Sequence, residues 1–170
     1  MKISVYLALS VNGMISNQKG VPDWLSGEYV QGFMSTSQQT KAVIMGKTTY
    51  NILAPDNLPF KDEGTIVVLT HDTSAKSSQS NVIFTDQDPR AIVALLESRG
   101  HTEAVIIGGT LTVSGFMKAG MVDDLHLIVE PFLFDGGLPL IKDAGDYKLA
   151  LVDVKKLSDR TVGLQYRVLK

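Results

Sequence analysis

Residues 104–110 read AVIIGGT, and residues 42–49 read AVIMGKTT. In each stretch a short apolar run ends in glycine and leads directly into residues with helical spacing. An apolar run without alternation is typical of a buried strand in a parallel sheet. Because ligands of open α/β sheets collect at the carboxyl ends of parallel strands, both glycine turns are candidate binding segments.

A helix that begins directly after such a glycine offers unpaired N–H groups and the positive end of its dipole. Glycine allows an anion to approach the backbone, and Thr48, Thr49, Thr110 and Thr112 add hydroxyl donors. Two such turns along one sheet edge can hold the diphosphate of a dinucleotide from both sides. The alternative is that the glycines only make tight strand–helix turns, but the pair together favours phosphate binding.

The rest of the chain repeats the alternation of strands and helices. Further β-branched runs predict strands at residues 3–9, 65–69, 82–84 and 125–129, and a closing hairpin at 148–157 and 161–169. Helices are predicted over residues 25–39, after Gly46 to Leu53, from Asp88-Pro89 to Gly100, and up to Lys118; Pro55 and Pro59 break the pattern between two of these elements. This order indicates one α/β domain over residues 1–170, with a mainly parallel sheet, helices on both faces and an antiparallel edge.

Composition limits the classes of partner and of site. The chain of 170 residues has a net charge of −2, which gives no broad basic field for nucleic acid or for anionic lipid. It has no cysteine, and its three histidines are far apart, so we expect no metal site. No signal peptide and no apolar stretch long enough to span a bilayer can be recognised. We therefore expect a cytoplasmic protein without membrane partners.

Common nucleotide and hydrolase motifs do not fit. Gly46-Lys47-Thr48 resembles the end of a Walker A loop, but Lys41 stands where that loop needs its first glycine. The chain contains neither the G-x-G-x-x-G fingerprint of dinucleotide-binding folds nor the G-x-S-x-G turn of serine hydrolases. A dinucleotide would therefore be bound in another way.

Other polar residues near predicted strand ends have two interpretations each. Thr70 and His71 follow the strand at 65–69 and can contact the extra phosphate of NADPH with Lys47 nearby, or His71 is an exposed loop residue. Asp23 and Glu28 flank Trp24 and can protonate a substrate nitrogen, but Asp23 as a helix cap and Glu28 as a solvated residue are favoured.

Glu130 ends the strand at 125–129 and therefore also points toward the ligand edge of the sheet. A buried salt bridge is the rival explanation. Glu28, Glu130 and Asp23 are the candidate catalytic residues.

In this order the motifs resemble the dihydrofolate-reductase-like superfamily. Within it, they are most similar to the reductase domain of bacterial riboflavin-synthesis deaminase/reductases and their stand-alone relatives. The resemblance covers essentially the whole chain and is carried by residues 8–15 (ALSVNGMI), 45–50 (MGKTTY), 106–110 (IIGGT), 120–125 (GMVDDL), Pro131 and 136–140 (GGLPL).

The resemblance implies a three-layer α/β/α domain with a mixed, mainly parallel sheet of about eight strands. It also implies NADPH as the cofactor, with its phosphates at Gly46–Thr49, its adenosine at Leu69–His71, and its diphosphate and nicotinamide at Gly108–Thr112. The residues implied are Ala8, Ile15, Gly46, Lys47, Thr48, Thr49, Leu69, Thr70, His71, Gly108, Gly109, Thr110, Leu111 and Thr112. Ala8 and Ile15 would touch the nicotinamide ring.

The resemblance also implies an activity, that of an NADPH-dependent oxidoreductase. The substrate it suggests is a small heterocycle, a ribosylaminopyrimidine similar to 5-amino-6-(5-phosphoribosylamino)uracil, and the assembly it suggests is a homodimer. Two departures keep other functions open. Tyr29, preceded by Glu28, stands where dihydrofolate reductases carry an acid, and the deaminase domain is missing. A dihydrofolate or pterin reductase and a catalytically silent nucleotide-binding module are the alternatives.

Overall fold

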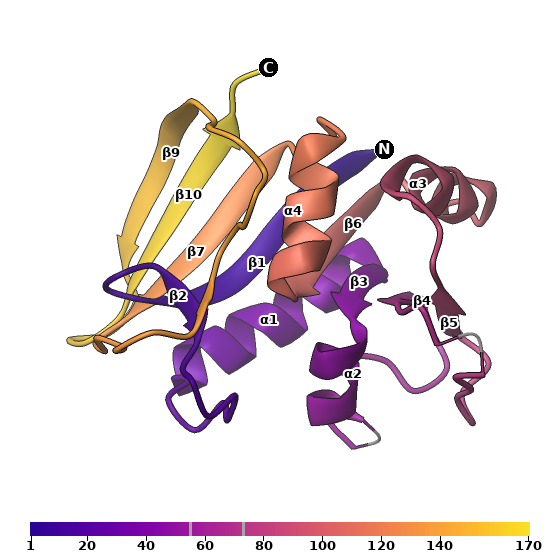
Figure 1. Ribbon diagram of the computed structural model, residues 1–170, viewed down its shortest axis with the longest axis horizontal. Coiled ribbons are helices and arrows are strands. Elements are labelled where there is room, and N and C mark those ends of the chain that lie inside the picture. The colour runs from indigo at the N-terminus through magenta and orange to yellow at the C-terminus, as the bar shows by residue number, and fades with distance from the viewer. Residues whose placement is uncertain (55, 73) are drawn as a thin grey trace.

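The computed structural model describes residues 1–54, 56–72 and 74–170, and the break predicted at Pro55 lies outside these residues. The elements are β1 (Lys2–Ser10), β2 (Met14–Ser16), α1 (Gly27–Thr40), β3 (Ala42–Gly46), α2 (Lys47–Leu53), β4 (Thr65–Leu69), β5 (Val82–Thr85), α3 (Pro89–Ser98), β6 (Glu103–Gly108), α4 (Thr110–Lys118), β7 (Asp124–Glu130), β8 (Leu138–Pro139), β9 (Leu149–Lys156) and β10 (Val162–Val168). Figure 1 shows the sheet running through the molecule, with β9 at one edge and β5 at the other.

Within the described residues, eight strands form the main sheet in the order β5-β4-β3-β6-β1-β7-β10-β9. The strands from β5 to β7 pair in parallel, whereas β10 is antiparallel to both β7 and β9. The predicted mixed sheet with a closing antiparallel hairpin is therefore confirmed. The parallel order brings the carboxyl ends of β1, β3, β4 and β6 to the same edge.

Two apolar clusters fill the space between the sheet and its helices. Side chains of β1 alternate between them: Val5 and Leu7 lie in the cluster that includes α3 and α4, whereas Tyr6 and Ala8 lie in the cluster that includes α1. This alternation follows from the two-residue period of a strand. The predicted three-layer α/β/α arrangement is confirmed.

The sequence predicted the cap of α3 correctly but not the cap of α1. Asp88 caps α3 as expected, since its side chain accepts hydrogen bonds from the amides of Arg90 and Ala91. The favoured interpretation that Asp23 caps the first helix is wrong. Ser26 is the cap, because its hydroxyl accepts a hydrogen bond from the Tyr29 amide, so α1 begins two residues later than predicted.

The short sheet of β2 and β8 was not predicted. These strands have three and two residues and pair across more than 120 positions, so no local period reveals them. Gly137, at a φ of +138°, precedes β8, and a Cβ atom there would overlap the carbonyl of Ser16.

No helix within the described residues has both the length and the apolar character needed to cross a bilayer.

Candidate functional site

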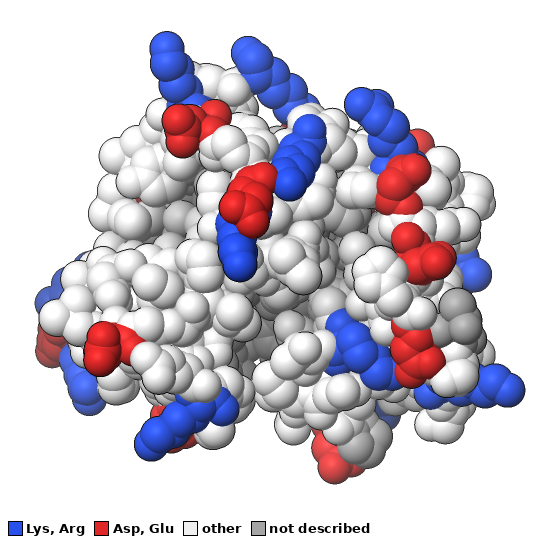
Figure 2. Space-filling view, in the orientation of Figure 1, with Lys and Arg blue, Asp and Glu red and all other residues white. Residues whose placement is uncertain are grey.

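A cleft of about 1160 Å³ opens at the carboxyl ends of β1, β3, β4 and β6. All fourteen residues predicted to bind the cofactor line it, from Ala8 and Ile15 to Gly108–Thr112. Figure 2 shows a hollow near the centre of this face, bordered mostly by uncharged residues, with charged side chains above it and at its lower right. The cleft therefore joins the two glycine turns, as the sequence predicted.

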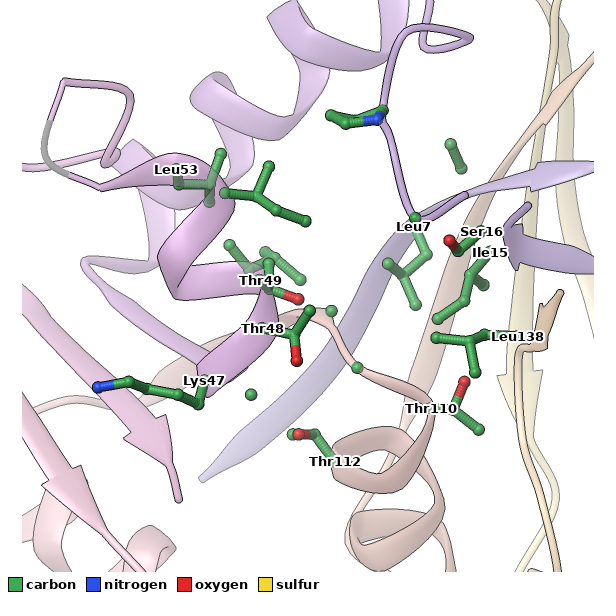
Figure 3. Close-up of a pocket in the computed structure, with 18 of the residues that line it drawn as sticks. Leu7, Ile15, Ser16, Lys47, Thr48, Thr49, Leu53, Thr110, Thr112 and Leu138 are labelled. Atoms are coloured by element: carbon green, nitrogen blue, oxygen red, sulfur yellow. The ribbon is translucent and has the colours of Figure 1, made fainter. Parts of the chain in front are cut away.

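A threonine from each glycine turn packs against the glycine of the other turn. A Cβ atom on Gly46 would lie 3.2 Å from the Thr112 hydroxyl oxygen, and a Cβ atom on Gly108 would overlap Thr49. Gly109 has a φ of +92°, and a Cβ atom there would lie 3.6 Å from the Gly46 amide nitrogen. Figure 3 shows Thr48 and Thr49 on α2 facing Thr110 and Thr112 on α4. The two turns thus form one cradle that side chains at the glycines would fill.

Lys47 extends from this cradle toward β4 and β5 (Figure 3). Its Nζ lies 4.4 Å from the ring centroid of Phe84 and 5.7 Å from that of Tyr50, both within the range of a cation–π contact. Hydrogen bonds from Ser74, and to a smaller extent the charge of Lys47, hold the pKa of Asp72 below its usual range. The Lys47 ammonium therefore lies near the Thr70–Asp72 turn.

We call the part of the cleft around the two glycine turns the glycine half. It is defined by the segments Gly46–Thr49, Leu69–His71 and Gly108–Thr112. The β2–β8 sheet borders it, because Ile15, Ser16 and Leu138 line the same cleft (Figure 3). The Thr110 hydroxyl donates a 2.5 Å hydrogen bond to the carbonyl of Pro139 and so ties the start of α4 to β8. This hydrogen bond links the Gly108-Gly109 turn to β8.

We call the part of the cleft lined by Trp24, Leu25, Tyr29, Val30, Phe33, Met34, Ile52 and Leu53 the apolar half; Asp56 and Asn57, from the segment after α2, also line the cleft. The Tyr29 ring stacks on Tyr6 at 5.6 Å between centroids, and Trp24 meets Phe134 edge-on at 5.1 Å. Burial, with a smaller contribution from Tyr6 and Glu130, raises the pKa of the Tyr29 hydroxyl. That hydroxyl is therefore neutral and able to donate a hydrogen bond at physiological pH.

The three candidate catalytic carboxylates are not among the described residues that line the cleft. Glu130 is 1% exposed, and its Oε1 accepts hydrogen bonds from the Ser26 hydroxyl (2.6 Å) and the Ser26 amide (3.1 Å). Its other oxygen accepts from the Thr161 hydroxyl at 3.3 Å. Glu130 thus holds the start of α1, while Asp23 is exposed and Glu28 is half-buried in the first turn. Their catalytic role stays a prediction.

Sequence reasoning missed most of the apolar half. The sequence singles out two of its residues, Tyr29 at the position of an acid in dihydrofolate reductases and Trp24 between Asp23 and Glu28. The other apolar residues of α1 lie within the predicted helix 25–39, but a helical period does not tell which of them meet a cleft rather than the core. No local pattern indicates that Leu138 lines the cleft, although the two glycines before it are a signal of close backbone approach.

The comparisons with known proteins agree with this geometry. Residues 1–163 match the model of the family described as RibD C-terminal domain. The uncharacterized protein YwjB of Bacillus subtilis (strain 168) is 31% identical over 172 residues, which cover 97% of each chain.

Two solved structures show the same fold. One is a diaminohydroxyphosphoribosylaminopyrimidine deaminase/5-amino-6-(5-phosphoribosylamino)uracil reductase from Thermotoga maritima, with a TM-score of 0.81 and 18% identity over 99% of this chain and 56% of that chain. The other is a dihydrofolate reductase from Enterococcus faecalis complexed with NADP(H) and RAB-propyl, with a TM-score of 0.72 and 18% identity over 99% of this chain and 97% of that chain. The predicted dihydrofolate-reductase-like fold is confirmed, and the chain belongs to the RibD C-terminal domain family.

Proposed function

We propose that this protein is an NADPH-dependent reductase of a small heterocyclic substrate. The observation that carries the proposal is the continuous cleft in which the Gly46 and Gly108-Gly109 turns form one cradle. Backbone that lacks Cβ atoms at this point leaves room for a diphosphate, and the hydroxyls of Thr48, Thr49 and Thr112 can donate to it. Family membership supports a reductase but leaves the substrate open, since one fold carries many reactions.

The other cofactor contacts follow from the same placement. The first amides of α4 and its positive dipole end face the cradle, which favours an anion there. Lys47, Thr70 and His71 lie at the end of the glycine half where the adenosine and its extra phosphate would be bound. Ala8 and Ile15 would contact the nicotinamide ring, on the side that faces the apolar half.

The apolar half would then hold the substrate beside the nicotinamide. NADPH, when bound there, supplies a hydride; the substrate gains that hydride and one proton from water, and NADP⁺ remains. The protein would orient the ring against Trp24 and Phe33. The resemblance suggests a ribosylaminopyrimidine, whereas Tyr29, which lines the cleft at the position of the missing acid, argues against a folate reaction that needs a carboxyl donor.

The assembly we propose is a homodimer. It is supported by β9, which forms an edge of the sheet and exposes Leu149, Leu151 and Val154; the Leu151 side chain is 57% exposed. An exposed apolar edge strand pairs readily with a second chain. Light scattering on the purified protein would give twice the mass of the chain, and a monomer at micromolar concentration would contradict this part of the proposal.

The activity is tested by titrating the protein with NADPH and then adding candidate heterocycles. We expect NADPH to bind with a dissociation constant in the micromolar range that is typical of cofactors and substrates, and its absorbance to fall when a substrate is present. Tight NADPH binding without oxidation over a panel of pyrimidines and pterins would favour the catalytically silent alternative. No binding of NADPH would contradict the proposed function as a whole.

A further inference from the structure

The wall of the apolar half is suited to a flat ring and unsuited to a phosphate. Trp24 is held edge-on by Phe134 and Phe132, and Tyr29 lies in a stack between Tyr6 and Phe33. Rings held in this way present fixed apolar surface on which a planar heterocycle can pack. A phosphate brought to the same wall loses its hydration and meets only neutral donors such as the Tyr29 hydroxyl, because none of the described residues of this wall is a lysine or an arginine.

The helix start beside this wall already faces an anion. Leu25 and Tyr29 line the cleft, and the cap residue between them, Ser26, donates both its amide and its hydroxyl to the Glu130 carboxylate. Glu28 adds a second carboxylate in the first turn of α1. The positive end of this helix dipole is therefore balanced by the protein itself, and a further anion would be repelled.

The basic groups along the cleft lie in the glycine half, where the Asp86 carboxylate also lines the cleft directly after β5. Among the described lining residues, Lys47 is the only lysine or arginine, and its ammonium lies in the glycine half near Phe84. Asp56, an exposed carboxylate, lines the cleft near Ile52 and Leu53. Lys19 is exposed in the loop before Gly20 and is not among the lining residues. The field in the apolar half thus favours a neutral ligand over an anionic one.

We propose that the substrate is a flat, uncharged heterocycle without a phosphate group, such as a pyrimidine or a pteridine ring. This inference rests on the proposed function, because it assigns the glycine half and Lys47 to NADPH. It replaces the phosphorylated ribosylaminopyrimidine, which the resemblance suggests, by an unphosphorylated compound of the same ring class. The residues that favour the unphosphorylated compound are Trp24 and Phe33 in the aromatic wall, Asp56, and Glu130 at the start of α1.

The test uses two compounds that differ only in the phosphate: 5-amino-6-ribitylaminouracil and its 5′-phosphate. Each is titrated calorimetrically into the protein saturated with NADP⁺, so that the readout is binding and not turnover. We expect the unphosphorylated compound to bind about 10-fold more tightly or better. Equal or tighter binding of the phosphate, or binding of neither compound to the NADP⁺ complex, would overturn the proposal.

A variant of α1 tests the physical reason. Val30 lines the cleft and is 47% exposed, so Val30→Lys places an ammonium at the apolar half without burying it. We expect this variant to bind the 5′-phosphate about 10-fold more tightly than the wild type does, by charge pairing. The matched control Val30→Gln, similar in length but neutral, should change both affinities by the same factor, so that the ratio between the two compounds stays as in the wild type. An unchanged affinity of Val30→Lys for the phosphate, in a variant with wild-type thermal stability, would contradict the role of charge.

A titration with NADPH alone separates the two levels of the argument. If the wild type binds NADPH but prefers the phosphorylated compound, the substrate class is wrong and the proposed reductase stands. If the wild type does not bind NADPH, the proposed function fails and the substrate class falls with it. Cofactor binding by Val30→Lys and Val30→Gln should match the wild type, because Val30 lies in the apolar half.

Discussion

The glycine half of the cleft is made largely of backbone, whereas the apolar half is made of side chains. In the glycine half, Gly46 and Gly109 approach each other and each is covered by Thr112. In the apolar half, the ring of Trp24, the face of α1 and the end of α2 come together from separate segments. A backbone site tolerates little change in the residues that form it, while a side-chain wall can be altered one residue at a time. The two halves should therefore respond differently to substitution.

The largest effect is expected at Gly46. Its φ of −81° suits any residue, and the atom near an added Cβ is the Thr112 hydroxyl oxygen at 3.2 Å, so Gly46→Val fills the cradle without straining the backbone. Gly109 is a poorer choice because its φ of +92° would strain any side chain. We expect the dissociation constant of NADPH to rise about 100-fold, measured by fluorescence titration.

The matched control is Gly27→Val, at the first position of α1, where an added Cβ meets no atom within 4 Å. Gly27 is outside the cleft lining, so this variant should bind NADPH as the wild type does. Wild-type affinity in a folded Gly46→Val protein would break the comparison, because the cradle would then not be the site of the diphosphate.

The contrast between the halves also explains what the sequence could predict. The glycine half depends on a local pattern, an apolar strand followed by glycine and a helix, and this pattern is visible in residues 42–49 and 104–110. The apolar half depends on where Trp24 and α1 pack, which is decided by tertiary contacts such as those of Tyr6 with Tyr29. Local periods carry no information about such contacts, so this wall could be found only in the folded chain.

Glu130 gives the second largest effect, on stability. Its sequence position at a strand end suggested catalysis, but in the fold its carboxylate accepts two hydrogen bonds from Ser26 and one from Thr161. Glu130→Gln keeps the shape and removes the charge, so the charge-assisted bonds weaken. We expect the free energy of unfolding to fall by about 1–2 kcal/mol in chemical denaturation, with unchanged affinity for NADPH.

This variant also tests the candidate catalytic role of Glu130. The control for the change in stability is Glu28→Gln, which neutralises a carboxylate that lies next to the same helix start but has no hydrogen bond to Ser26 among the described residues. A Glu130→Gln protein with wild-type stability and strongly reduced turnover would mark Glu130 as a proton donor and would contradict the positioning role.

Lys47 should have a smaller effect, confined to the choice of cofactor. Its ammonium lies beside Phe84 and near the Thr70–Asp72 turn, where the extra phosphate of NADPH would be bound. Lys47→Ala is expected to weaken NADPH binding about 10-fold and NADH binding about twofold or less. Lys76→Ala is the control, because Lys76 is exposed and is not among the lining residues. An equal loss for both cofactors would show that Lys47 binds the diphosphate instead.

The smallest effect is expected at Tyr29, and its pH dependence is the informative part. Because burial raises the pKa of this hydroxyl, the phenol is protonated throughout the neutral and mildly alkaline range and cannot account for an alkaline limb of the rate profile. Tyr29→Phe should therefore change the turnover number but leave the pH profile between about pH 6 and 9 unshifted. Tyr50→Phe is the control, since the Tyr50 hydroxyl bonds to Ser77 and Tyr50 is not among the lining residues. A displaced alkaline limb in Tyr29→Phe would mean that the phenol titrates in the working range, and the apolar half would then hold an acid after all.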